Sequence, residues 1–257
     1  MGGQQMNVGP GVAWIVGGGS GIGAAVAREL ADRGWTVAIS GRRAERLDEV
    51  AAHNPSIRPY PLDVTDTRAV LATVNAIASD LGRLDLALYG AVAAVGTPPG
   101  YYEPEKFAAA FDVNFLGLVR ALDPLIEVMG RQGGGQIAVI GSLAGYVGLP
   151  RGGAYAASKS ALMTLCQTMR VELAPRNILV RLISPGFVKS ELTSRNRYRM
   201  PMLMETDEAA WRIVDGLVRS ARFEIAFPWP MAWMMKAARL LPYRLFFWLS
   251  ALTLRAR

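Results

Sequence analysis

The stretch Val12-Ala-Trp-Ile-Val16 leads directly into Gly17-Gly-Gly-Ser-Gly-Ile-Gly23, and an alanine-rich segment begins at Ala24. The apolar run predicts a buried strand, the glycines predict a tight turn, and the segment after them predicts a helix. A helix that starts on such a turn directs its backbone N–H groups and its positive end towards one point. Because anions such as a pyrophosphate bind at such points, the stretch predicts a nucleotide site, although glycines alone are also typical of a flexible turn.

The rest of the chain, as far as about residue 228, alternates short apolar runs with segments of helical period. This alternation predicts an α/β fold with a doubly wound parallel sheet of about seven strands, because strands covered by helices on both faces are apolar throughout. Strands are expected near residues 12–17, 35–40, 57–62, 84–91, 136–141, 178–184 and 224–227, and helices near 21–33, 43–53, 66–82, 104–130, 152–174 and 206–221. These elements make up one domain over residues 9–228, after a flexible or tag-like start over residues 1–8.

The composition of the 257 residues, 51% hydrophobic and 19% charged, favours one large core and argues against disorder. Cys166 and His53 are each alone of their type, so we expect no intrachain disulfide, no metal site and no Ser-His-Asp triad. Acid–base chemistry must then come from tyrosine, lysine or carboxylates. The lone cysteine and a polar, glycine-rich beginning without a secretory signal favour a cytoplasmic protein.

The net charge of +7 is concentrated in the last third of the chain. Residues 1–185 contain 16 basic and 15 acidic side chains, whereas residues 186–257 contain 12 and 6. Because these basic residues are interleaved with apolar ones and no nucleic-acid module accompanies them, a nucleic-acid partner is not expected.

Residues 229–257 form an apolar and aromatic extension that is expected to be helical. Its longest stretch without a charge, residues 245–254, has ten residues, whereas a membrane span needs about 20. Three interpretations stay open: burial against another subunit, peripheral contact with an anionic membrane surface, and cover of a substrate cleft.

Two arginines follow the second expected strand, where a dinucleotide site usually has an acidic residue that binds the ribose 2′-hydroxyl. Arg42 and Arg43 can instead bind a 2′-phosphate, since guanidinium groups bind phosphate in a bidentate manner. The alternative is a solvated pair of arginines at the start of the next helix. We therefore expect NADP(H) as the preferred cofactor, with NAD(H) as the alternative.

Tyr155 and Lys159 lie four residues apart in a segment that predicts a helix, so both side chains are expected on one face. A nearby ammonium group favours the phenolate and lowers the pKa of a tyrosine towards neutrality, as a general acid or base requires. A Tyr-x-x-x-Lys pair alone is also common on protein surfaces.

Five motifs, in this order and spacing, resemble those of the short-chain dehydrogenase/reductase family. They are the glycine turn at 17–23, Asn114 in Asp112-Val-Asn-Phe-Leu-Gly117, Ser142 in Ile140-Gly-Ser-Leu-Ala-Gly145, the pair Tyr155 and Lys159, and Ser184-Pro-Gly-Phe-Val-Lys-Ser190. The resemblance covers roughly residues 10–228 and is specific for the family, not for a substrate. It implies a Rossmann-type fold and an NAD(P)-dependent oxidoreductase that interconverts a carbonyl and an alcohol.

The resemblance also implies a role for each matching residue. Tyr155 would exchange a proton with the substrate oxygen, and Ser142 would hydrogen-bond the same oxygen. Lys159 would lower the tyrosine pKa and bind the nicotinamide ribose, and Asn114, at a helix irregularity, would hold a water that links Lys159 to solvent. Cofactor contacts are expected from Gly17, Gly19, Ser20, Gly21, Ile22, Gly23, Arg42, Arg43, Asp63, Val64, Gly90, Ala91, Tyr155, Lys159, Pro185, Gly186, Val188 and Ser190. Taken singly, Asn114, Ser142 and Asp63 are also typical of a polar helix residue, a turn residue and a helix cap.

Two positions depart from the family pattern. Val16 replaces the threonine of the glycine loop, and Tyr89-Gly-Ala-Val92 replaces the Asn-Asn-Ala-Gly that normally ends the fourth strand. The second change affects side-chain contacts near the cofactor and leaves only backbone contacts from Gly90 and Ala91. It keeps open a second interpretation, a non-catalytic dinucleotide-binding regulator or scaffold with the same fold.

A substrate lid is expected over residues 187–206, where Arg195, Arg197 and Arg199 precede three methionines. One hypothesis is an apolar substrate with an acidic or phosphate-bearing end, and the alternative is a solvated basic loop. The resemblance further implies a hydrophobic small-molecule carbonyl or alcohol as substrate and a homodimer or homotetramer as the assembly.

Overall fold

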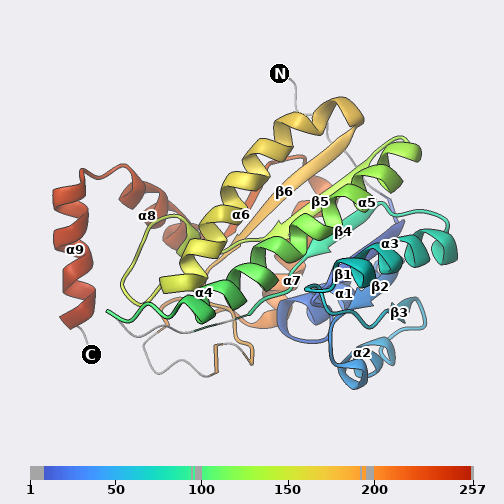
Figure 1. Cartoon of the computed structure of the whole chain (residues 1–257), viewed down its shortest axis with the longest axis horizontal. Helices are drawn as coiled ribbons and strands as arrows, with labels where there is room; N and C mark the ends of the chain where they lie inside the picture. The colour runs from blue at the N-terminus through green and yellow to red at the C-terminus, as the bar shows by residue number, and fades with distance from the viewer. Residues whose placement is uncertain (1–8, 94, 96–99, 192, 195–199, 256–257) are drawn as a thin grey trace.

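Seven parallel strands form one sheet at the centre of the protein (Figure 1), in the order β3-β2-β1-β4-β5-β6-β7. The structure is a computed structural model that describes residues 9–93, 95, 100–191, 193–194 and 200–255, so the tag-like start lies outside it. The strands are β1 (Val12–Val16), β2 (Thr36–Ser40), β3 (Ile57–Pro59), β4 (Leu86–Tyr89), β5 (Gly135–Ile140), β6 (Ile178–Pro185) and β7 (Glu224–Phe227). The strand order reverses between β1 and β4, which is where ligands bind at the carboxyl ends of open α/β sheets.

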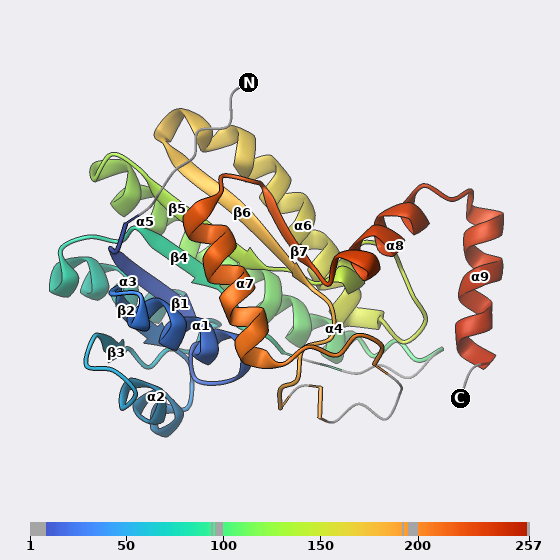
Figure 2. The ribbon, with the colours of Figure 1, turned by 180° about the vertical axis from the view of Figure 1, so that it is seen from behind.

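Helices cover both faces of this sheet (Figures 1 and 2). One face carries α3 (Thr67–Leu81), α5 (Gly117–Arg131) and α6 (Gly153–Glu172), and the other carries α1 (Gly21–Asp32) and α7 (Thr206–Arg219). α2 (Ala44–Ala51) follows β2, and the short 3₁₀ turns η2 (Leu143–Gly145) and η3 (Ala174–Arg176) flank α6. The prediction of a doubly wound parallel sheet is therefore confirmed.

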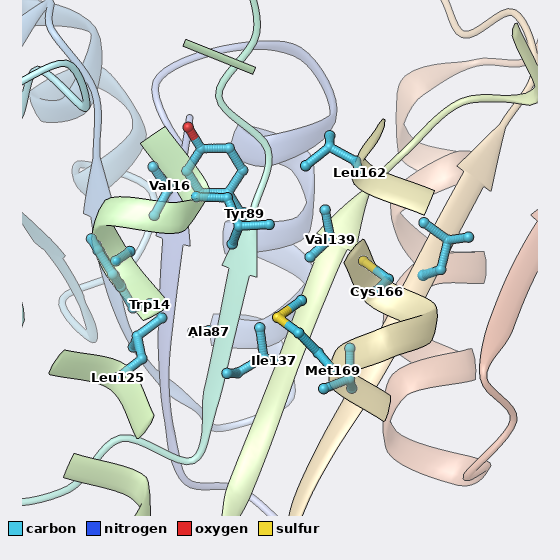
Figure 3. Packing of buried hydrophobic residues seen from close by; sticks show 14 of the residues in the cluster. Trp14, Val16, Ala87, Tyr89, Leu125, Ile137, Val139, Leu162, Cys166 and Met169 are labelled. Carbon is cyan, nitrogen blue, oxygen red and sulfur yellow. The ribbon is translucent and has the colours of Figure 1, made fainter. Parts of the chain in front are cut away.

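The core consists of two apolar layers, one on each face of the sheet. In β1, Trp14 and Val16 face the layer under α3, α5 and α6, whereas Ile15 faces the layer under α1 and α7. Figure 3 shows the first of these layers, with Trp14, Tyr89 and Cys166 packed among aliphatic side chains. Burial raises the pKa of the Cys166 thiol to about 12, so this cysteine is an apolar packing residue.

The helix expected over residues 104–130 is present, and it contains a π-helical irregularity. It consists of α4 (Pro104–Phe111), the π-helical segment η1 (Asp112–Leu116) and α5. A π-helical turn holds one more residue than an α-turn, so it changes which side chains face inwards. Asn114 lies in η1 and is fully buried, at the helix irregularity that the family resemblance implies.

The C-terminal extension forms two helices, α8 (Trp229–Arg239) and α9 (Tyr243–Arg255), as its apolar sequence predicts. Figures 1 and 2 show α8 leading away from the end of β7 and α9 standing clear of the sheet and its helices. Over the described part of the chain, none of the helices is long and apolar enough to cross a membrane.

Candidate active site

The glycine turn after β1 lies at the carboxyl edge of the sheet. Gly17 has a φ of +87° and lies so close to Gly90 that a side chain at position 17 would meet the Gly90 backbone at 2.8 Å. Only glycine fits this position without strain. The turn joins β1 to α1, which starts at Gly21. Of the predicted residues, the turn contains Gly17, Gly19 and Ser20, and the first turn of α1 contains Gly21, Ile22 and Gly23.

The amino terminus of α1 fits the phosphates of a dinucleotide. Ser20, the N-cap residue, makes no capping hydrogen bond with its side chain, so the backbone N–H groups of the first turn remain available to an anion. A cleft of about 330 Å³ opens beside this turn and is lined by Gly19, Ser20, Arg46 and Ser190, among others. A larger depression of about 560 Å³ between α1, α2 and α7 contains none of the predicted site residues.

Basic side chains gather at the start of α2, beside the glycine turn. Arg42 and Arg43 are exposed between β2 and α2, and Arg46 lies with its Cβ near Gly19. Glu191 reaches this cluster from the expected lid, with its Oε2 3.3 Å from Arg43 Nη2 and its Oε1 3.5 Å from Arg46 Nη2. These ion pairs are about half exposed, so they are weak and open to competition from another anion.

The loop after β3 holds Asp63 and Val64. Asp63 is exposed, and its Oδ1 accepts hydrogen bonds from the backbone N–H and the hydroxyl of Thr65, which lower the pKa of its carboxyl group. The interpretation of Asp63 as a helix cap is wrong, because Asp66 caps α3 by accepting from Arg68 N and Ala69 N. Val64 is buried beside α5.

Tyr89 ends β4 and points into the layer beneath α5, as Figure 3 shows. Its hydroxyl donates a hydrogen bond to the backbone oxygen of Val113, in η1, at 2.5 Å. Gly117 leaves room for it, since a Cβ there would collide with the Tyr89 hydroxyl and approach Val64 within 2.9 Å. Gly90 and Ala91 follow on the chain, and Gly90 N–H donates to Val16 O at 2.8 Å.

Asn114 links three elements. Its Oδ1 accepts the backbone N–H of Ala93 at 2.7 Å, and its Nδ2 donates to the hydroxyl oxygen of Ser158, in α6, at 2.9 Å. The Ser158 hydroxyl in turn donates to Tyr155 O. Asn114 is therefore held between the loop after β4 and the helix that carries Tyr155 and Lys159.

Ser142 and the Lys159 ammonium group lie where β5 ends, and Tyr155 precedes Lys159 by one turn of α6. Ser142 precedes η2, and its Oγ accepts a hydrogen bond from the Ala144 N–H at 3.1 Å. This is the role of a turn residue, the alternative that the sequence allowed for Ser142 taken singly. η2 packs directly on α6, because Gly145 lies against the Lys159 backbone. Lys159 Nζ donates to Ile140 O at 2.7 Å and lies 5.8 Å from the centre of the Tyr155 ring.

The Lys159 ammonium group is buried at the edge of the sheet. It is 2% exposed, and this burial lowers its pKa from 10.5 to about 8. A lysine with such a pKa changes its charge within the range in which an enzyme works, which is typical of functional sites. Over the residues that the structure describes, no group of three or more His, Cys, Asp and Glu side chains could hold a metal ion.

The segment after β6 lies on the other side of this site. Pro185 ends β6, and Gly186 N–H donates to Phe227 O at 2.7 Å. Val188 is buried and forms a β-bridge with Met204. Ser190 lies beside the first residue of α1, because a Cβ added to Gly21 would be 3.5 Å from the Ser190 Cβ. The two ends of the expected lid are thus joined at the edge of the sheet, next to the cleft beside the glycine turn.

A carboxylate network joins α8 to this edge. Glu224, in β7, accepts hydrogen bonds from Tyr146 and, at 2.6 Å, from the hydroxyl of Ser184, and it lies 2.8 Å from Lys236 Nζ in α8. These bonds lower the pKa of the Glu224 carboxyl group in spite of its burial. Because Tyr146 directly follows η2, the network ties α8 to the turn that carries Ser142.

Comparison with known proteins decides the family. A family model described as short chain dehydrogenase matches residues 11–201 of this chain. The chain belongs to the short-chain dehydrogenase family. It is therefore an NAD(P)-dependent oxidoreductase, and the family assignment made from its five motifs is confirmed.

Relatives and solved structures of other short-chain dehydrogenases agree with this assignment. The chain is 37% identical over 238 residues to a Myxococcus xanthus protein described as an uncharacterized oxidoreductase, covering 91% of this chain and 94% of that one. A Mycobacterium tuberculosis protein with the same description is 28% identical over 239 residues, 90% of this chain and 94% of that one. A short-chain dehydrogenase structure from Streptomyces avermitilis has a TM-score of 0.81 at 22% identity and covers 89% of this chain and 92% of that one.

Three residues of the candidate site in this short-chain dehydrogenase were not indicated by the sequence, and for Tyr89 the sequence did not indicate the contact of its hydroxyl. Arg46 and Glu191 line the cleft beside the glycine turn, Ser158 accepts a hydrogen bond from Asn114, and the Tyr89 hydroxyl donates one to η1. Arg46 follows Arg42 and Arg43 by about one helical turn, which is the one signal that could have indicated it. The other contacts join segments far apart in the chain, so no local pattern predicts them.

Proposed function

We propose that this short-chain dehydrogenase is an NADP(H)-preferring oxidoreductase that interconverts a carbonyl and an alcohol on a hydrophobic small molecule. The observation that best supports this is the buried Lys159 ammonium, 2.7 Å from Ile140 O and 5.8 Å from the Tyr155 ring centre, on a helix packed against the turn of Ser142. A bound nicotinamide cofactor supplies or accepts the hydride. The side chains of this chain orient the substrate and move the proton.

Tyr155 would donate its phenolic proton to the carbonyl oxygen during reduction and take a proton from the alcohol during oxidation. The Ser142 oxygen already accepts the Ala144 N–H, so the serine hydroxyl can donate its own proton to the same substrate oxygen. The positive charge of Lys159 favours the phenolate that remains on Tyr155 after transfer. Asn114, buried beside Ser158, would hold a water that returns the proton through Lys159.

The preference for NADP(H) rests on the arginines at the start of α2. Arg42 and Arg43 lie on the loop after β2, and Arg46 lines the cleft beside the glycine turn. The loop at residues 41–43 contains no acidic residue to bind a ribose 2′-hydroxyl, although Glu49 and Glu191 also line the cleft. Guanidinium groups are suited to a 2′-phosphate. A calorimetric titration should give a Kd for NADPH at least about tenfold below that for NADH, and equal Kd values would contradict the preference.

The decisive experiment is the substitution Tyr155→Phe, assayed with NADPH and a panel of hydrophobic ketones and aldehydes. Removal of a general acid should lower kcat by a factor of about 100 or more and leave the Kd for NADPH within about twofold. The matched control is Tyr60→Phe, since Tyr60 donates its hydroxyl to Asp80, away from the site. Unchanged turnover in Tyr155→Phe would overturn the mechanism.

The altered loop at residues 89–92 left a second interpretation open in the sequence, a non-catalytic dinucleotide-binding regulator or scaffold. It predicts tight NADPH binding without turnover of any carbonyl or alcohol in the wild-type protein. The intact group of Ser142, Tyr155 and Lys159 supports the enzyme instead.

Arg195, Arg197 and Arg199, on which an acidic or phosphate-bearing substrate end depends, lie outside the described residues. That hypothesis stays a prediction, and equal kcat/KM for neutral and carboxylate-bearing carbonyls would contradict it. The homodimer or homotetramer and the cytoplasmic location stay predictions as well.

A further inference from the structure

Large apolar side chains are exposed together on α8 and α9. Soluble proteins expose single apolar residues widely, but a contiguous exposed group marks an interaction surface. Six aromatic or aliphatic side chains of this region are each at least 61% exposed, namely Trp229, Trp233, Leu240, Tyr243, Phe247 and Trp248.

α9 makes little contact with the rest of the protein. In Figures 1 and 2 it stands clear of the sheet and of every helix except its neighbour α8. Among the α9 side chains that the structure describes, only Phe246 and Ser250 are not exposed. A helix of 13 residues without packing is marginal in water, so α9 needs a partner that covers its apolar side chains.

The charges of this region indicate what that partner is. Residues 225–257 contain five Lys and Arg residues and no Asp or Glu. Lys236 pairs with Glu224, whereas Arg239 and Arg244 are exposed and have no carboxylate within ion-pair distance among the described residues. A second copy of the same segment would bring like charges together, whereas an anionic surface is complementary to them.

The residue types and the helix length suit a lipid surface. Tryptophan and tyrosine gather where a membrane meets water, and arginine can bury its stem while its charge stays in water. The 13 residues of α9 are about 20 Å long, whereas the hydrocarbon core of a bilayer is about 30 Å thick. The helix can therefore lie in the interface but not cross the bilayer.

We propose that α8 and α9 form a membrane-docking element that places this protein peripherally on an anionic lipid surface. The aromatic side chains enter the interface, and the arginines face the lipid headgroups. This inference does not depend on the proposed reaction, because it concerns helices that carry none of the catalytic residues.

The test is co-sedimentation of the full-length protein with phosphatidylcholine vesicles that contain, or lack, about one third phosphatidylglycerol. Binding to the anionic vesicles should exceed binding to phosphatidylcholine by at least about tenfold, and it should weaken at high salt. The double variant Phe247→Ser/Trp248→Ser should lose at least about 90% of the bound fraction. Arg239→Glu/Arg244→Glu should lower the affinity for the anionic vesicles by at least about tenfold and leave that for neutral vesicles unchanged.

Two matched controls change the same residue types on the body of the protein. Trp211→Ser removes a 51% exposed tryptophan from α7, and Arg176→Glu reverses an exposed charge in η3. Both should bind vesicles like the wild-type protein. Each variant is first checked by its thermal midpoint, and a change in that midpoint is not expected for side chains that are exposed.

Two outcomes would overturn the proposal. One is wild-type protein that stays in the supernatant with both kinds of vesicle. The other is a double variant at residues 247 and 248 that still sediments with vesicles but changes its mass in analytical ultracentrifugation, because α9 would then bind a second copy of the chain.

Discussion

Tyr89 replaces an amide of the family pattern with a buried phenol. Burial raises the pKa of this tyrosine above its ordinary value, so the phenol stays neutral and donates its proton to the Val113 oxygen. Val113 lies in the π-helical segment directly before Asn114. The substitution that looks like a defect in the sequence therefore supplies a positioning contact for a predicted catalytic residue.

The variant Tyr89→Phe keeps the ring and removes this hydrogen bond. Because the Val113 oxygen loses a buried donor, the free energy of unfolding should fall by about 1–3 kcal/mol. Urea denaturation measures this change, and Tyr60→Phe, whose hydroxyl bonds an exposed carboxylate, should cost less than about 1 kcal/mol. Equal effects of the two variants would contradict a special role of the Tyr89 hydroxyl.

Lys159 gives the protein a pH-dependent stability. The unfolded chain holds this proton up to a pH of about 10.5, whereas the folded protein releases it near pH 8 because burial lowers the pKa. The unfolded state therefore binds more protons between these values, and the stability contributed by this residue rises with pH across the window.

The comparison of wild-type protein with Lys159→Met isolates this contribution. Wild-type stability relative to the variant should increase by up to about 3 kcal/mol from pH 8 to pH 10.5 and stay constant below pH 7. Urea unfolding at several pH values measures the difference, in which titrating groups that do not interact with Lys159 cancel. If the difference in stability between wild type and variant does not vary with pH, then burial does not lower the pKa of Lys159.

Strands and helices were predictable to within a few residues because each follows a local pattern of apolar residues. The expected strand near 136–141 is Gly135–Ile140, and the expected helix near 152–174 is Gly153–Glu172. The π-helical turn at η1 was not predictable from periodicity, since apolar residues continue on both sides of it and Gly117, which directly follows it, does not by itself indicate such a turn. Only the family resemblance indicated an irregularity at Asn114.

The arrangement of the candidate site was predictable where one element carries the whole signal, as with the glycine turn or with Tyr155 and Lys159. It was not predictable where two elements meet. Glu191 and Arg43 are 148 residues apart in the chain, and only the packing of the expected lid against α2 brings them together. The same holds for Ser158 and Asn114, which α6 and η1 bring into contact.

The contact between Glu191 and α2 leads to a prediction about cofactor choice. Glu191 binds Arg43 and Arg46, the groups that we expect to bind the 2′-phosphate, so the carboxylate and the phosphate compete. Glu191→Gln should lower the Kd for NADPH by about two- to fivefold at low salt and leave the Kd for NADH unchanged. Calorimetric titration measures both values.

Glu205→Gln is the matched control for that prediction. Glu205 lies at the other end of the expected lid and pairs with Lys189 rather than with α2. The effect of Glu191→Gln should also diminish at high salt, because exposed ion pairs are screened. If both variants change the Kd for NADPH and the Kd for NADH equally, the effect comes from the lid and not from competition for the arginines.

The whole molecule consists of a closely packed α/β body and a C-terminal extension that contacts it unevenly. Met231 and Ala232 of α8 are buried against the body, and Lys236 pairs with Glu224. The described side chains of α9, in contrast, are mostly exposed. Part of the positive charge excess in the last third of the chain therefore lies on α9, which contributes little to the core.

Two truncations test this difference. Removal of residues 243–257 should change the thermal midpoint by less than about 2 °C, because α9 buries little against the body. Removal of residues 229–257 should lower it by about 5–10 °C, because buried apolar side chains and a partly buried ion pair are lost. Circular dichroism measures both midpoints, and equal midpoints for the two truncated proteins would show that α8 is not part of the core.

The Glu224 network gives the extension a fixed direction. Tyr146, Ser184 and Lys236 meet on one carboxylate, so α8 cannot rotate freely with respect to the turn that carries Ser142. A lipid surface bound by the exposed side of α8 would then lie at a constant angle to the edge of the sheet that carries Ser142. A substrate that partitions into lipid could diffuse to this edge in two dimensions, and its concentration in the membrane, not its solubility in water, would set the rate of capture.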